Sequence, residues 1–166
     1  WSARELIKTN ASNRERMQIN ILTIGKPDAV FQKVIEYYEK KCRNYYRVNL
    51  IQLRDSKVKD IPVKIKEEEN SLLKSLPRGY QCVLDERGVQ FDTLQFAEFI
   101  KNHVERSIDL NFIIGGAYGL GQAVKDTADK IIRLSDFTLQ HDVAYTVLLE
   151  QIYRAFTLMK NVPYHK

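Results

Sequence analysis

The chain has 166 residues, of which 44% are hydrophobic and 28% are charged, and its net charge is +5. This length and balance fit one globular domain better than two, and no apolar run approaches the roughly 20 residues that a membrane span needs. Residues 1–16 hold four basic and two acidic residues and so supply +2 of the charge. The surplus of +3 on the remainder leaves a polyanionic partner open without requiring one.

The first sixteen residues are polar and lack a strand pattern, whereas Met17 opens the first clear strand. We predict an N-terminal extension over 1–16, disordered or derived from a leader or from cloning, and a single domain over 17–166. The extension has no apolar central region, which argues against a secretory signal. Cys42 and Cys82 fall on apolar positions of predicted elements. They are expected to be buried, reduced thiols in a reducing, cytoplasmic environment.

The first half of the domain alternates strand and helix patterns. Residues 17–24 alternate and are β-branched, as expected of a strand, and Gly25-Lys26-Pro27 ends it. The next helix is predicted over 28–46, because apolar residues recur at spacings of four and three: Phe31, Ile35, Tyr38, Cys42 and Tyr45. A second strand follows over 48–53. A Lys- and Glu-rich helix over 61–76 has a weak apolar pattern and is expected to be solvated over most of its surface.

The second half continues the alternation. A strand over 80–84 precedes a helix whose start carries a capping box at 92–95. Residues 110–114 form a continuous apolar run, which is typical of a central strand covered on both faces. A last strand over 131–134 leads to an amphipathic helix over 142–160. The chain is therefore predicted to be α/β, with a mostly parallel sheet and helices on both faces.

Glycines follow the predicted central strand in the segment 115–121, Gly-Gly-Ala-Tyr-Gly-Leu-Gly. Glycines at this place let the backbone turn sharply and approach a ligand closely. The spacing does not match the Gly-x-Gly-x-x-Gly of dinucleotide sites, and it follows the fourth strand instead of the first, which disfavours a Rossmann-type dehydrogenase. A plain strand-to-helix turn remains the alternative for this segment taken alone.

A second polar segment, 134–139, lies between the last strand and the last helix. Its Ser, Asp and Thr suit capping of that helix, and a helix start also offers free N–H groups to a ligand. Both segments follow the carboxyl ends of strands, the edge at which open sheets bind ligands. Together they predict a ligand site for a molecule with many polar edges.

The remaining candidates lie near the end of the sequence. Tyr164 and His165 fall outside any burying pattern, so a frayed end and a segment folded into a site are both open. Arg154 follows Glu150 by four residues, which suits a helical ion pair or a guanidinium for a phosphate. His103 is expected on a helix surface. No Cys/His cluster and no phosphate-binding loop motif is present, so we expect neither metal nor nucleoside-triphosphate chemistry.

Several segments together closely resemble the RlmH family of SPOUT-class methyltransferases, in the same order and at the same spacings. They are 112–120, 134–141, 149–156 and 163–166, preceded by a first strand at 17–26. The resemblance covers essentially 17–166. It departs at Gln140, where the family usually has Pro, and in residues 1–16, which the family lacks.

The resemblance implies a C-terminal trefoil knot, a homodimer and S-adenosylmethionine as methyl donor. It further implies methylation of N3 of a pseudouridine in helix 69 of large-subunit ribosomal RNA, on the assembled ribosome. Arg154, Tyr164 and His165 would be the catalytic or RNA-side residues. The implied donor contacts are Leu84, Gly115, Leu134, Ser135, Asp136, Phe137, Thr138 and Leu139. A SPOUT enzyme acting on another nucleotide, such as one in transfer RNA, and a non-catalytic ribosome-binding module remain the alternatives.

Overall fold

Five parallel strands form the centre of the fold, in the order β2-β1-β4-β3-β5. The structure, a computed structural model, describes residues 17–165, so the predicted extension over 1–16 lies outside the described residues. The strands are β1 (Gln18–Ile24), β2 (Arg47–Leu53), β3 (Tyr80–Gln90), β4 (Leu110–Ile114) and β5 (Lys130–Arg133). The prediction of an α/β fold with a mostly parallel sheet is confirmed.

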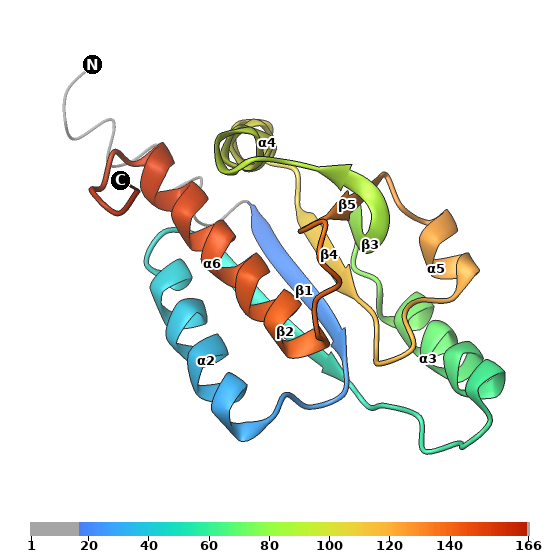
Figure 1. Ribbon diagram of the computed structural model, residues 1–166. Coiled ribbons are helices and arrows are strands. Elements are labelled where there is room, and N and C mark those ends of the chain that lie inside the picture. Colours follow the sequence, from blue (N-terminus) through green and yellow to red (C-terminus); the bar gives the residue numbers. More distant parts are fainter. Residues whose placement is uncertain (1–16, 166) are drawn as a thin grey trace.

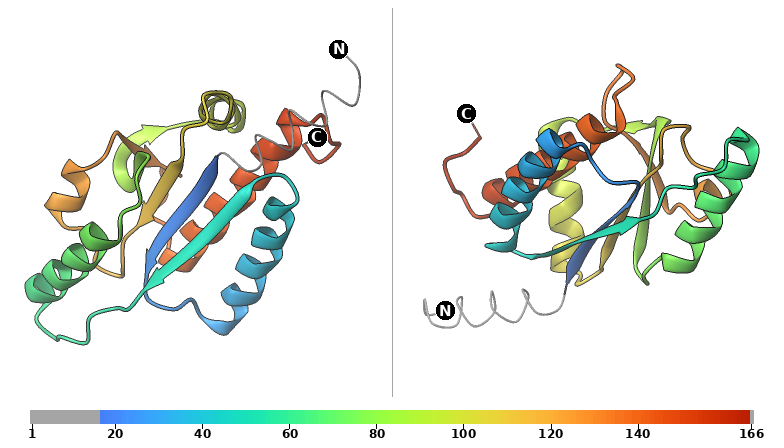
Figure 2. Two further views of the ribbon diagram at one scale, coloured as in Figure 1. Left: turned by 180° about the vertical axis from the view of Figure 1, so that it is seen from behind. Right: turned by 90° about the horizontal axis from the view of Figure 1, so that it is seen from below.

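Helices cover both faces of this sheet (Figures 1 and 2). One face packs against α2 (Ala29–Arg43), α4 (Thr93–Glu105) and α6 (His141–Met159), and the other against α3 (Ile61–Ser75) and α5 (Gln122–Asp126). The larger core lies on the α2, α4 and α6 side, where Phe112 and Phe156 are fully buried. Residues 110–114 are all buried, as the continuous apolar run of β4 predicts.

Strand β3 is longer than its sequence pattern indicates. The apolar run ends at Leu84, but the backbone continues to Gln90 with a shift of register against β5 between Leu84 and Val89. Gly88 allows this pairing, because a Cβ there would lie 2.7 Å from the backbone of Ile131. The strand pattern in the sequence ends at the charged residues after Leu84. The strand itself continues, because backbone pairing does not depend on side-chain hydrophobicity.

One expectation about a polar residue is wrong. His103 is buried instead of lying on the surface: its Nδ1 lies 2.8 Å from the Phe99 carbonyl oxygen, and Tyr80 packs against its ring. The error arises because a polar side chain satisfied by a tertiary contact leaves no trace in local hydrophobic periodicity. Helix α3 is solvated over most of its surface, as expected, although Glu68 and Glu69 on it are buried.

Candidate functional site

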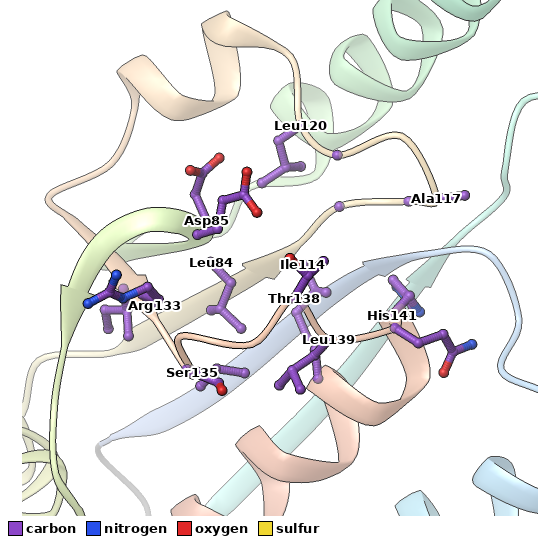
Figure 3. A pocket seen from close by; sticks show the side chains of 18 of the residues that line it. Leu84, Asp85, Ile114, Ala117, Leu120, Arg133, Ser135, Thr138, Leu139 and His141 are labelled. Carbon is purple, nitrogen blue, oxygen red and sulfur yellow. The ribbon is translucent and has the colours of Figure 1, made fainter.

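A pocket of about 780 Å³ opens at the carboxyl edge of the sheet, between the middle of β3, where its register shifts, and the turns that leave β4 and β5 (Figure 3). Its size is within the range of small-molecule sites. The first turn of α6 closes one side, through His141 and Ala144. The sequence predicts that the segments 115–121 and 134–139 lie at this edge. In the structure both segments line the same pocket.

The glycine segment after β4, residues 115–121, makes one wall and is called the glycine loop below. Gly116 and Gly119 form an isolated bridge, and Gly119 has a φ of +82°, a conformation that favours glycine. A Cβ at Gly115 would lie 2.8 Å from the backbone of Gly119 and from Leu120 Cγ. The loop is thus a compact turn whose glycines leave backbone exposed to the pocket beside side chains such as Leu120.

The segment after β5 makes the facing wall. Of the eight predicted donor contacts, seven line the pocket: Leu84, Gly115, Leu134, Ser135, Phe137, Thr138 and Leu139. Asp136 does not line it; its exposed carboxylate pairs with Arg133 at 3.1 Å. Helix α6 is capped by Gln140, whose side chain accepts the Val143 N–H at 3.3 Å. The interpretation of Ser135, Asp136 or Thr138 as the cap is therefore wrong.

Charged residues that the sequence did not single out also line the pocket. Asp85 follows Leu84 on β3 and pairs with Lys125 of α5 at 2.6 Å. Burial by itself would raise the pKa of Asp85, but hydrogen bonds from Lys125 and the Arg87 N–H outweigh it and hold that pKa below its ordinary value. The pocket thus carries an ionised carboxylate. The sequence signal that could have identified Asp85 as a site residue is its position directly after the apolar run of β3.

The start of α6 is tied to the turn after β1. His141 Nδ1 lies 3.0 Å from Asp142 Oδ1, and Asp142 Oδ2 accepts the Asp28 N–H at 3.0 Å. Asp142 is buried. The long-range contact between Asp28 and Asp142 holds the first turn of α6 against the sheet edge, and His141 in that turn forms part of the pocket wall.

The three predicted catalytic residues gather elsewhere, around Glu150. Arg154 Nη2 and Nε bond to Glu150 Oε1 at 2.7 and 3.1 Å, and Tyr164 donates its hydroxyl to the same oxygen at 3.0 Å. Arg154 Nη1 lies 3.2 Å from His165 Nδ1. The guanidinium also stacks over the Tyr164 ring, 4.6 Å from its centroid. Sequence reasoning treated Glu150 only as an ion-pair partner, whereas the structure makes it the common acceptor of this cluster.

The protonation of this Glu150 cluster follows from its bonds. The hydrogen bond from Arg154 to Glu150 raises the pKa of the guanidinium, which stays charged. Burial and a hydrogen bond with Tyr38 raise the pKa of Tyr164 well above its ordinary value, so its phenol stays protonated at neutral pH. A guanidinium only donates, so His165 Nδ1 accepts from Arg154 and a neutral ring carries its proton on Nε2.

The pocket includes the first turn of α6, whereas Arg154 lies in the second half of that helix and Tyr164 and His165 follow its end. Thirteen residues separate His141 from Arg154, and at 1.5 Å per residue this is about 20 Å along the axis. Within one subunit the structure therefore does not bring Arg154, Tyr164 and His165 together with the predicted donor contacts.

Comparisons with known proteins identify the family of this chain. Residues 17–165 match the family model described as "Predicted SPOUT methyltransferase". The chain belongs to this family. Two relatives called "Ribosomal RNA large subunit methyltransferase H" are each 37% identical: that of Trichlorobacter lovleyi over 152 residues, covering 90% of this chain and 99% of the relative, and that of Halothermothrix orenii over 159 residues, covering 90% and 100%. A third, from Malacoplasma penetrans, is 31% identical over 157 residues, covering 90% of this chain and 100% of the relative.

Solved structures share the fold at low identity. A probable methyltransferase from Bordetella pertussis superposes with a TM-score of 0.52 at 10% identity, covering 90% of this chain and 99% of that chain. A probable methylase family protein from Haemophilus influenzae gives 0.53 at 11% identity, covering 91% and 70%. These likenesses concern the fold alone.

The methyl donor of SPOUT methyltransferases is S-adenosylmethionine, and the pocket suits it. A nucleoside with a charged amino-acid arm needs backbone groups close to its polar edges, apolar contacts for its ring and room of several hundred Å³. The glycine loop supplies close backbone approach, and Leu84, Ile114 and Leu139 supply the apolar contacts. Within residues 17–165, no three His, Cys, Asp or Glu side chains gather in a way that could hold a metal ion.

Proposed function

We propose that this protein transfers the methyl group of S-adenosylmethionine to large-subunit ribosomal RNA, at N3 of a pseudouridine in helix 69. The observation that carries the proposal is the pocket at the sheet edge, formed by the same segments through which the chain resembles full-length RlmH relatives. None of the described helices is long and apolar enough to cross a membrane.

In this proposal the donor lies between the two walls of the pocket. Leu84, Gly115 and the residues of 134–139 other than Asp136 contact it, the last of these mainly through backbone N–H and C=O groups. Asp85, held ionised by Lys125, offers carboxylate oxygens as hydrogen-bond acceptors in the pocket wall. When bound, S-adenosylmethionine supplies a methyl group that its sulfonium already activates.

The acceptor side of the site requires a second copy of the chain. Because the Glu150 cluster lies about 20 Å from the pocket of its own subunit, we propose a homodimer in which Tyr164 and His165 of one subunit reach the pocket of the other. The C-terminal trefoil knot and the division into an extension over 1–16 and a domain over 17–166 belong to the same proposal.

The chemistry at the acceptor follows from the bonds of the Glu150 cluster. An imide N3–H is a poor nucleophile until its proton leaves to solvent, after which N3 bonds to the methyl carbon while the carbon–sulfur bond breaks. Arg154 is charged, and His165 accepts from it at Nδ1 and so presents Nε2–H outward. We therefore assign both to stabilising the imide anion, instead of assigning His165 as the base. Tyr164, a protonated ring, provides a stacking surface for the target base.

The substrate is proposed to be the assembled ribosome. Residues 17–166 carry a surplus of only +3, which is little for holding free RNA against screening by salt. The remaining recognition would come from the shape of the ribosomal surface around the target.

Two measurements test the proposal. Calorimetry is expected to give micromolar binding of S-adenosylmethionine, and labelled methyl groups are expected to enter ribosomes but not a short free hairpin of the same sequence. Absence of donor binding would favour a non-catalytic ribosome-binding module. Efficient methylation of the free hairpin, or of transfer RNA instead of ribosomes, would contradict the proposed substrate.

A further inference from the structure

Helix α3 presents two consecutive carboxylates, Glu68 and Glu69, toward the glycine loop. The two residues are only 4% and 5% exposed. Carboxylates are rarely buried to this degree unless they are paired or hydrogen-bonded, because leaving water is costly for a charge. Neither residue lines the pocket, so direct contact with the donor does not explain their burial.

Glu69 caps α5 from another helix. Gly121 precedes α5 and has no side chain to accept the free N–H groups of its first turn. Glu69 Oε2 accepts the Ala123 N–H at 2.8 Å, while Oε1 pairs with Lys66 at 2.7 Å. The hydrogen bond from Lys66 outweighs burial, with a further contribution from the Ala123 N–H, and holds the pKa of Glu69 below its ordinary value. The carboxylate is therefore ionised where it fixes the far end of the glycine loop.

Glu68 lies against the near end of the loop. Its Oε1 accepts the Ser56 N–H at 3.0 Å and pairs with Lys64 at 3.2 Å. Its Oε2 lies 2.9 Å from the position that a Cβ would take at Gly116. The carboxylate is thus fixed by α3 and by the loop before it, and packs directly on the backbone at Gly116.

Two of the glycines are explained by these carboxylates instead of by the pocket. A Cβ at Gly121 would lie 2.1 Å from Glu69 Oε2, which is closer than real Cβ contacts allow. Gly116 is restricted by Glu68 in the same way, whereas Gly115 is restricted by the loop itself. Glycine at 116 and 121 permits support from α3, so the loop is held at both ends from outside the pocket.

We infer that Glu68 and Glu69 are positioning residues for the methyl donor. They hold the glycine loop in its donor-binding conformation before the donor arrives. Donor binding therefore loses less conformational entropy of the loop. The inference deepens the proposed function and rests on it. Losing either carboxylate should weaken donor binding more than it slows turnover at saturating donor.

The test compares Glu68→Ala, Glu69→Ala and Glu69→Gln with the control Asn70→Ala. Asn70 is exposed on the same helix. Calorimetry should show a dissociation constant for S-adenosylmethionine about tenfold higher in the two buried alanine variants, as expected for loss of a helix cap or a charged hydrogen bond. Glu69→Gln keeps an oxygen acceptor for Ala123 and should recover most of the affinity. The control should match the wild type, and turnover on ribosomes at saturating donor should change less than threefold in every variant.

Unchanged donor affinity in both alanine variants, even with a lower melting temperature, would reduce the two residues to structural ones. If Glu69→Ala does not fold, Gly121→Ala decides the question, because its methyl group displaces the Glu69 carboxylate while every charge is kept. A folded Gly121→Ala protein with wild-type affinity would overturn the inference. Failure of the wild type itself to bind the donor would instead overturn the proposed function, so the two failures are distinguishable.

Discussion

The pocket at the sheet edge and the Glu150 cluster differ in what they are made of. The pocket is formed by glycine backbone, apolar side chains and the Asp85–Lys125 ion pair, at the middle of β3 and at the turns that leave β4 and β5. The cluster is formed by charged and aromatic side chains on one helix and on the segment that follows it. The first suits close contact with a small molecule, and the second suits charge and stacking toward RNA. Under the proposed function, one subunit is expected to suffice for binding the donor, whereas transfer is expected to need two.

Helix α6 keeps the two regions apart at a fixed spacing. Its buried side, which includes Leu148, Ile152 and Phe156, packs into the larger core against α2 and α4. The two regions share no residue, and Arg154 lies about 20 Å along the helix from His141. Substitutions in one region should therefore act independently of the other.

The largest effect is expected from deleting residues 164–166. Methyl transfer to ribosomes should fall at least about 100-fold, because the variant lacks the stacking ring and the Nε2–H of His165 that the acceptor side needs. The dissociation constant for S-adenosylmethionine should stay within about twofold of the wild type, since the pocket is about 20 Å away. Unchanged turnover on ribosomes would end the assignment of this segment to the site.

Mixing two inactive variants tests whether the pocket of one subunit works with the C-terminal residues of the other. The deletion variant keeps its pocket, whereas Gly115→Val should lose it because even a Cβ there lies 2.8 Å from Gly119. After unfolding and refolding together in equal amounts, half of the dimers are mixed and each has one complete site, so roughly a quarter of wild-type activity should return. Activity that stays at the level of the separate variants would place both regions in one subunit.

A smaller change at the pocket is expected to affect binding alone. In Gly115→Ala the added methyl group meets the Gly119 backbone and Leu120, so the glycine loop must shift. Donor affinity should fall about tenfold or more, as measured by calorimetry. Circular dichroism serves as the control that the fold is kept. Wild-type affinity in a folded variant would show that the loop does not contact the donor.

Arg154→Lys changes the Glu150 cluster and leaves the pocket unchanged. Lysine keeps the charge but cannot bond to Glu150 and His165 at once with a planar fork. Turnover on ribosomes should fall about tenfold while the KM for the donor stays unchanged. A higher KM for the donor with normal turnover would contradict the separation of the two regions.

The smallest effect is expected from Tyr164→Phe, which removes the 3.0 Å hydrogen bond to Glu150 and keeps the ring packed on Tyr153 and Arg154. The loss of one hydrogen bond, about 1 kcal/mol, should lower turnover by roughly fivefold. Because burial raises the pKa of Tyr164, its phenol should not titrate between about pH 6 and pH 9, and the pH profile of turnover should keep its shape. If wild-type turnover falls toward high or low pH and this fall is absent in the variant, Tyr164 acts as an acid or base.

The kinds of element and their order follow from local sequence. Patterns typical of strands, including the continuous apolar run at 110–114, predicted all five strands, and helical periodicity predicted helices between them. The turns after β4 and β5 were correctly placed at one edge, since parallel strands put their carboxyl ends together. Family resemblance supplied the donor and the RNA, which no local pattern contains.

How polar groups are satisfied and how far apart the candidate residues lie depend on the folded chain. The burial of Glu68, Glu69 and His103, the pairing of Asp85 with Lys125, and the extension of β3 to Gln90 all depend on partners distant in the chain. The separation of Arg154 from the pocket depends on the direction of α6 across the sheet. Hydrophobic periodicity reports which side of an element faces the core, but long-range hydrogen bonds and helix directions are set by the assembled fold.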